Sequence, residues 1–118
     1  MPARIDWFYI RTACTTCKNA RAYLDDGQIE VAEYHDARKE KIGPVEALKL
    51  LEGIEQLIAI KGKKVAKYDL VKARPADEEL LSHLIGPTGN LRAPSARVGP
   101  TFVVGYNPDA YREVFDQR

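Results

Sequence analysis

The chain has 118 residues, of which 45% are hydrophobic and 30% are charged, with a formal net charge of +1 at pH 7. This length predicts a single domain over residues 1–118 that buries a core without disulfide or metal staples. The near-balance of charge gives no basis for binding nucleic acid or a membrane surface, and no stretch approaches the ~20 apolar residues that span a bilayer. The sequence opens without the apolar segment of a signal peptide, so we expect a cytoplasmic protein.

The amino-terminal part predicts a strand, a helix and a second strand. Residues 5–10 are apolar and aromatic, which favours a buried strand. Residues 15–26 are helix-forming, and Gly27 is expected to adopt the left-handed conformation just past the helix end. Alternating residues over 29–34 predict the second strand. Strand, helix and strand within about 30 residues indicate a βαβ unit with parallel strands.

The middle of the chain, from about residue 40 to residue 90, is interpreted as a helical insertion. One helix is expected to begin at Pro44, and another after Pro75. An apolar patch over residues 54–60 and a lysine cluster over residues 61–64 lie between them. The expected buried positions of the two helices are Val45, Leu48 and Leu51, and Leu80, Leu81, Leu84 and Ile85.

The carboxy-terminal part returns to strands. Residues 95–98 and 101–104 flank the turn Gly99-Pro100 and predict an antiparallel hairpin. A last helix is expected from Pro108, with Tyr111, Val114 and Phe115 on one face. The expected fold is therefore α/β, with a βαβ unit, the helical insertion and a ββα unit.

Two cysteines, Cys14 and Cys17, lie two residues apart where the first strand leads into the first helix. Backbone N–H groups and the helix dipole stabilise an anion at a helix N-terminus, which favours the thiolate that attacks disulfides. We assign Cys14 as the nucleophile and Cys17 as the resolving thiol, against the alternative of two ordinary reduced thiols. The only histidines, His35 and His83, lack the spacing of a zinc site, so we expect no metal and no cofactor.

Three segments of the chain resemble motifs of the arsenate reductase (ArsC)/Spx family, in its CxxC-bearing branch. They are residues 14–24 (Cys-x-x-Cys and then Lys-Asn-Ala-Arg-Ala-Tyr-Leu), residues 89–94 (Gly-Asn-Leu-Arg-Ala-Pro) and residues 104–107 (Val-Gly-Tyr-Asn). The resemblance covers nearly the whole chain. It implies a thioredoxin-like fold with a mixed four-stranded sheet, and a cis peptide between Ala93 and Pro94 beside the redox cysteine.

The resemblance implies a thiol–disulfide oxidoreductase in which Cys14 and Cys17 form a reversible disulfide. A thioredoxin- or glutaredoxin-type protein would supply the electrons, and the substrate would be a small oxyanion or a disulfide. Arg92, Pro94 and Lys61 would lie on the substrate side, since family members bind oxyanions with arginines. An exposed loop position is an equal alternative for Arg92 and the favoured interpretation for Lys61.

The match departs from the family where arginines are expected. Ala93 precedes the proline, residues 61–64 read Lys-Gly-Lys-Lys, and Gly105 follows the last strand. Lysine supplies charge without the bidentate geometry of a guanidinium. These departures argue against arsenate as the substrate.

Two other functions stay open. An Spx-like relative would be a redox-sensing regulator that binds RNA polymerase, and a third possibility is a redox-inert family member. The resemblance implies that such regulators carry a longer tail after the last helix than the one in this sequence. The oxidoreductase is therefore the leading hypothesis. The oligomeric state also stays open, with a monomer among the options.

Overall fold

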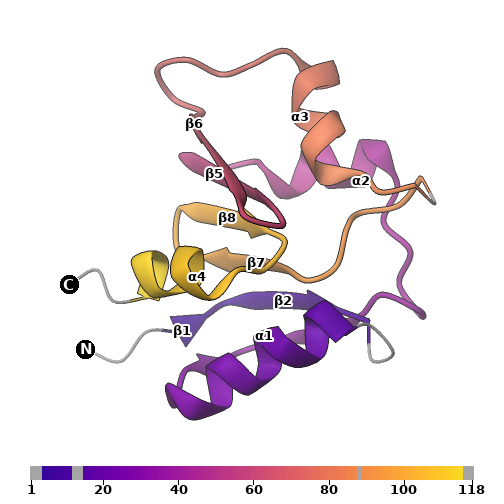
Figure 1. Ribbon diagram of the computed structural model, residues 1–118. Coiled ribbons are helices and arrows are strands. Elements are labelled where there is room, and N and C mark those ends of the chain that lie inside the picture. Colours follow the sequence, from indigo (N-terminus) through magenta and orange to yellow (C-terminus); the bar gives the residue numbers. More distant parts are fainter. Residues whose placement is uncertain (1–3, 12–14, 88, 116–118) are drawn as a thin grey trace.

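The computed structural model describes residues 4–11, 15–87 and 89–115. Within them, a six-stranded mixed sheet lies between two pairs of helices, and a two-stranded sheet extends it near the amino terminus (Figure 1). The helices are α1 (Thr15–Asp26), α2 (Pro44–Leu50), α3 (Asp77–Leu84) and α4 (Pro108–Phe115). The strands are β1 (Arg4–Ile5), β2 (Trp7–Ile10), β3 (Glu30–Val31), β4 (Tyr34–Asp36), β5 (Gln56–Lys61), β6 (Lys64–Asp69), β7 (Ser95–Val98) and β8 (Thr101–Val104). None of the described helices has the length and apolar character of a membrane span.

The predicted βαβ unit is confirmed, with each of its strands in two parts. β1 pairs with β3 and β2 pairs with β4, all in parallel. Asp6 separates β1 from β2: its N–H donates to the Arg97 carbonyl at 2.9 Å, and its carboxylate accepts from the Gly99 N–H at 2.8 Å. The first strand therefore bends at Asp6 to follow the β7–β8 turn.

The helix predicted over residues 15–26 is confirmed, but the left-handed residue after it is Gln28, with φ 55°, and not Gly27. The Gly27 N–H donates to the Tyr23 carbonyl at 3.0 Å, which is the helical pattern of i to i−4. The helical hydrogen bonding thus extends through Gly27, and the reversal falls on the next residue.

The region between residues 40 and 90 contributes two strands to the main sheet as well as two helices, so the predicted four-stranded sheet is wrong. The observed strand order is β4-β2-β7-β8-β5-β6, with β5 parallel to β8 and antiparallel to β6. Residues 57–60 of β5 are all buried. A strand covered on both faces has a continuous apolar run and lacks the alternation that marks a half-buried strand. This is why β5 resembled an apolar patch.

Side chains of the sheet alternate between two cores. Phe8, Ile58 and Val103 pack with α1 and α4, whereas Tyr9, Leu57 and Phe102 pack with α2 and α3. Figure 1 shows these helix pairs on opposite sides of the sheet. Period-two alternation along each strand explains how the same strands serve both cores.

The inner face of α2 was only partly predicted, while those of α3 and α4 match better. Ala47 and Leu51 are buried at i and i+4, but Val45 is 64% exposed. Leu80 and Leu84 of α3 and Tyr111 and Phe115 of α4 are buried as expected. The antiparallel β7–β8 hairpin is confirmed, with Gly99 at φ 58° in its turn.

Leu57→Ala tests the place of β5 in the core. Because Leu57 is fully buried, we expect its truncation to lower the free energy of unfolding by about 2–5 kcal/mol in urea denaturation. Val71→Ala is the control, since Val71 is 69% exposed and its truncation should cost less than about 0.5 kcal/mol. Equal effects of the two changes would contradict the position assigned to β5.

Candidate functional site

Cys17 lies in the first turn of α1 with its side chain against the sheet. It is 1% exposed and belongs to the core that α1 and α4 share, together with Ala20 and Leu24 of its own helix. The backbone N–H of Arg11, just past β2, donates to the Cys17 sulfur at 3.3 Å. This buried position fits the predicted resolving thiol. Cys14 lies outside the described residues, so its role as nucleophile stays a prediction.

An aromatic group fills the core behind Cys17. The Tyr111 ring meets those of Tyr106, Phe115 and Tyr23 edge to face, with centroids 4.8, 5.4 and 5.8 Å apart. The Tyr111 hydroxyl is buried and has no hydrogen-bond partner among the described residues. Burial raises the pKa of Tyr111, and Cys17 and Tyr106 raise it further, so the phenol stays neutral. Tyr111 therefore adds no negative charge to the core that holds Cys17.

The segment before β7 has the predicted cis peptide between Ala93 and Pro94. Pro94 is buried, and its carbonyl accepts from the Gly105 N–H at 2.8 Å. The Ser95 hydroxyl donates to the Arg92 carbonyl at 2.5 Å. The Ser95 bond closes a turn within the segment, and the Gly105 bond holds the segment against the chain that leaves β8.

Arg92 braces two other elements through its side chain. Its guanidinium donates to the Ile60 carbonyl at 3.0 Å, at the end of β5, and to the His83 carbonyl at 3.3 Å, near the end of α3. Burial lowers the pKa of Arg92, although the group stays charged at neutral pH. Two of its donors are thus committed to backbone carbonyls. Lys61, beside Ile60, is exposed.

Gly105 has no room for a side chain. Its φ is 91°, and a Cβ there would lie 2.3 Å from the Ile60 carbonyl oxygen. An arginine therefore cannot occupy this position without a shift of β5. Arg92 is thus bonded to carbonyls, Lys61 is exposed, and Gly105 cannot supply the arginine that the family motif expects after the last strand.

A cleft of about 570 Å³ opens at the end of β2 and contains residues that the sequence interpretation missed. Arg38 and Lys41 line it together with Arg11 and Arg92. The available signal was topological: parallel strands end at one edge of a sheet, so the residues after β2 and β4 meet there.

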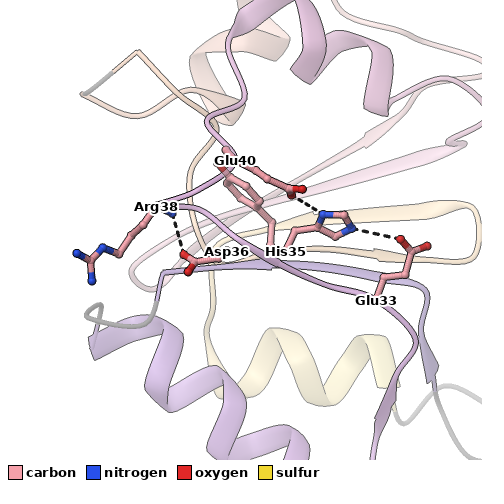
Figure 2. Close-up of polar contacts among 6 residues, drawn as sticks. Glu33, His35, Asp36, Arg38 and Glu40 are labelled. Atoms are coloured by element: carbon pink, nitrogen blue, oxygen red, sulfur yellow. Dashed lines mark hydrogen bonds and ion pairs between the residues drawn. The ribbon is translucent and has the colours of Figure 1, made fainter.

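The loop after β4 is fastened to the sheet by polar contacts, which Figure 2 shows. His35 contacts the Glu40 carboxylate through Nδ1 and the Glu33 carboxylate through Nε2, the latter at 3.3 Å. The Tyr9 hydroxyl donates to the Glu40 carbonyl at 2.5 Å, and the Asp36 carboxylate accepts from the Arg38 N–H at 2.9 Å. The Arg38 side chain extends away from His35 in this view.

Metal ligands are not grouped in the part of the chain that the structure describes. There, no three His, Cys, Asp or Glu side chains lie close enough to hold a metal ion.

The family model described as "ArsC family" matches residues 9–114. The chain belongs to the ArsC family. It is 30% identical over 105 residues to the regulatory protein MgsR of Bacillus subtilis, covering 86% of this chain and 82% of that protein. It is 26% identical over 108 residues to the global transcriptional regulator Spx of Streptococcus mutans, covering 88% and 78%. The resemblance predicted from the sequence motifs is confirmed.

A solved structure described as the YffB (PA3664) protein has the same fold. The TM-score is 0.55 at 20% identity, and the match covers 92% of this chain and 97% of that one. The mixed α/β fold agrees with the thioredoxin-like fold of the ArsC family.

Gly105→Ala tests the close approach of β5. The left-handed φ and the clash with the Ile60 carbonyl should together lower the free energy of unfolding by about 2–4 kcal/mol. Gly53→Ala is the matched control, because Gly53 has φ 79° with nothing within 4 Å of an added Cβ. It should lose only about 1 kcal/mol, for backbone strain alone. Equal losses would show that β5 does not press on Gly105.

The His35 contacts make stability depend on pH. Burial lowers the pKa of His35, but the hydrogen bonds to Glu40 and Glu33 outweigh it, so its pKa is raised overall. The stabilisation is therefore full below the unfolded value of about 6.5 and is lost as pH rises through the folded-state pKa. We expect His35→Gln to destabilise the chain near about pH 6, by about 1 kcal/mol or less, and to have little effect near about pH 9. Urea unfolding at both pH values measures this, and a loss independent of pH would contradict it.

Proposed function

We propose that the chain is a thiol-based redox sensor that acts as a regulatory protein, with Cys14 and Cys17 cycling between dithiol and disulfide. The observation that carries this is the similarity to two proteins named as regulators, over most of their length. The second candidate function given below uses the same pair of thiols.

The position of Cys17 supports the role of resolving thiol. Its sulfur is buried and accepts the Arg11 N–H, in the first turn of α1. In the proposed step the Cys14 thiolate attacks a disulfide RSSR, releasing one RSH and leaving a mixed disulfide. Cys17 then displaces the second RSH. The pair thereby loses two electrons and two protons, which the two RSH products carry.

The partner of the regulator would be RNA polymerase, as the resemblance to Spx-like proteins implies. Pro94 would shape the surface beside the thiol pair, since its carbonyl is fixed by Gly105. Arg92 would position this segment through the Ile60 carbonyl. Lys61, which directly follows Ile60 and is exposed, would supply a positive charge on the substrate side.

A thiol–disulfide oxidoreductase, reduced by a thioredoxin- or glutaredoxin-type protein, is the second candidate. It is favoured by the placement of Cys17 in the first turn of a helix that follows a sheet strand, where the helix dipole favours thiolate chemistry. Arsenate is not the proposed substrate, because Gly105 excludes a side chain and Arg92 bonds to carbonyls.

Disulfide formation tests both candidates. After mild oxidation, mass spectrometry with a thiol-alkylating reagent should find both cysteines protected in the wild-type chain. Cys14→Ser and Cys17→Ser should each leave their remaining thiol open to alkylation once the protein is unfolded. A wild-type chain that never protects its thiols would be a redox-inert family member, and the proposal would fail.

Two assays separate the regulator from the oxidoreductase. For the regulator, the oxidised wild-type chain should retain purified RNA polymerase several-fold more than the reduced chain, and Cys14→Ser should lose this difference. For the oxidoreductase, NADPH should be consumed with thioredoxin, thioredoxin reductase and a disulfide substrate, again only with Cys14 present. Turnover without redox-dependent polymerase binding would favour the second candidate.

A further inference from the structure

The cleft at the end of β2 concentrates positive charge that the proposed thiol chemistry does not use. Arg11, Arg38, Lys41 and Arg92 line it, and no acidic side chain does so among the residues that the structure describes. The chain as a whole is nearly neutral, with 18 basic and 17 acidic residues. The charge in the cleft is therefore a local feature of the fold.

The carboxylates at the end of β4 and in the loop after it contact groups other than the side chains of the cleft's cations. Asp36 accepts the Arg38 N–H, and the Glu40 side chain contacts His35 (Figure 2). Within the described ranges, Arg11, Arg38 and Lys41 form no ion pair. Their charges are thus available to an external anion. Arg38 and Lys41 lie on the loop after β4, which the Tyr9 hydroxyl fixes through the Glu40 carbonyl.

The volume of the cleft and the exposure of its cations favour an extended ligand. The cleft, about 570 Å³, is in the range of sites for ligands of many atoms and exceeds the needs of a single oxyanion. Arg11, Arg38 and Lys41 are exposed at its rim, while Arg92 is half-buried. A small-anion site needs polar groups that converge inside a pocket, whereas rim cations suit a chain with several carboxylates.

The walls between the cations suit a peptide. Ala37, Leu91 and Ala93 provide apolar surface, against which the aliphatic stems of glutamate side chains can pack. Nucleic acid is disfavoured, because Tyr9, the aromatic residue lining the cleft, is 1% exposed and offers no face for base stacking.

We propose that the cleft lined by Arg11, Arg38, Lys41 and Arg92 binds an acidic peptide segment of a partner protein, through salt bridges to its carboxylates. Two lining residues connect the cleft to the elements around Cys17: the Arg11 N–H contacts the Cys17 sulfur at 3.3 Å, and Ala93 precedes the cis-proline Pro94. A bound segment therefore lies against Arg11, whose backbone contacts Cys17. This deepens the proposed function, on which its biological role rests, although the binding itself requires no redox step.

Titration of the reduced ¹⁵N-labelled chain with a hexaglutamate peptide, followed by NMR, tests the proposal. We expect amide shifts concentrated at Ala37–Lys41 and Asn90–Ala93, and binding that weakens with added salt. Arg38→Gln/Lys41→Gln should weaken binding about tenfold, as expected for the loss of two partly exposed ion pairs. The control Lys72→Gln/Arg112→Gln removes the same charge at exposed positions outside the cleft and should change affinity less than about twofold.

Three results would overturn the proposal. One is a set of amide shifts outside the cleft, or an equal loss in the control variant. Another is binding of citrate or inorganic phosphate to the cleft as tight as that of hexaglutamate, which would make it a small-anion site. The third is tighter binding of a single-stranded oligonucleotide. The same titration with Cys14→Ser/Cys17→Ser separates the two proposals, since peptide binding should persist in a chain that cannot form the disulfide.

Discussion

The parallel pairing of β5 with β8 is the contact on which the rest of the structure depends. It joins the β5–β6 hairpin from the middle of the chain to four strands from the two ends, with Leu57 opposite Phe102 and Ala59 opposite Val104. The β5–β6 hairpin is then held from both sides: Lys67 contacts Glu113 of α4, and the Tyr68 hydroxyl is 2.7 Å from His83 Nε2 of α3. Both helical layers are thereby tied to one edge of the sheet.

The same strand organises the thiol side of the molecule. The Ile60 carbonyl, at the end of β5, receives the Arg92 guanidinium and sits against Gly105. Gly105 in turn holds the Pro94 carbonyl. An arginine that the sequence suggested for anion binding thus serves mainly to join β5, α3 and the cis-proline segment. The other cations that line the cleft form no ion pair among the described residues: Arg11 follows β2, and Arg38 and Lys41 lie in the loop after β4.

Local patterns predicted the parts of the fold that depend on neighbours in sequence. The limits of α1 and the hairpin around Gly99-Pro100 followed from local spacing, whereas the cis peptide before Pro94 was expected from the family resemblance alone. The sequence interpretation failed where distant pairing decides the outcome. β5 lacks alternation because both its faces are covered, and Val45 is exposed because α2 turns Ala47 and Leu51 inward. Arg38 and Lys41 join Arg11 through the parallel pairing of β2 and β4; the predicted βαβ unit implied this pairing, but no motif marked the three cations as one group.

The closeness of Gly105 to β5 has a consequence for protein engineering. Introducing the arginine that the family motif expects at this position is more than a change of one side chain, because the Ile60 carbonyl occupies the space of its Cβ. The same carbonyl is the anchor of Arg92, so moving β5 outward to admit a new side chain would also release the residue that holds the proline segment. Replacing Gly105 alone would therefore not give this chain the arginine-lined oxyanion site that the family motif expects. Such a redesign would have to start from the backbone of the hairpin.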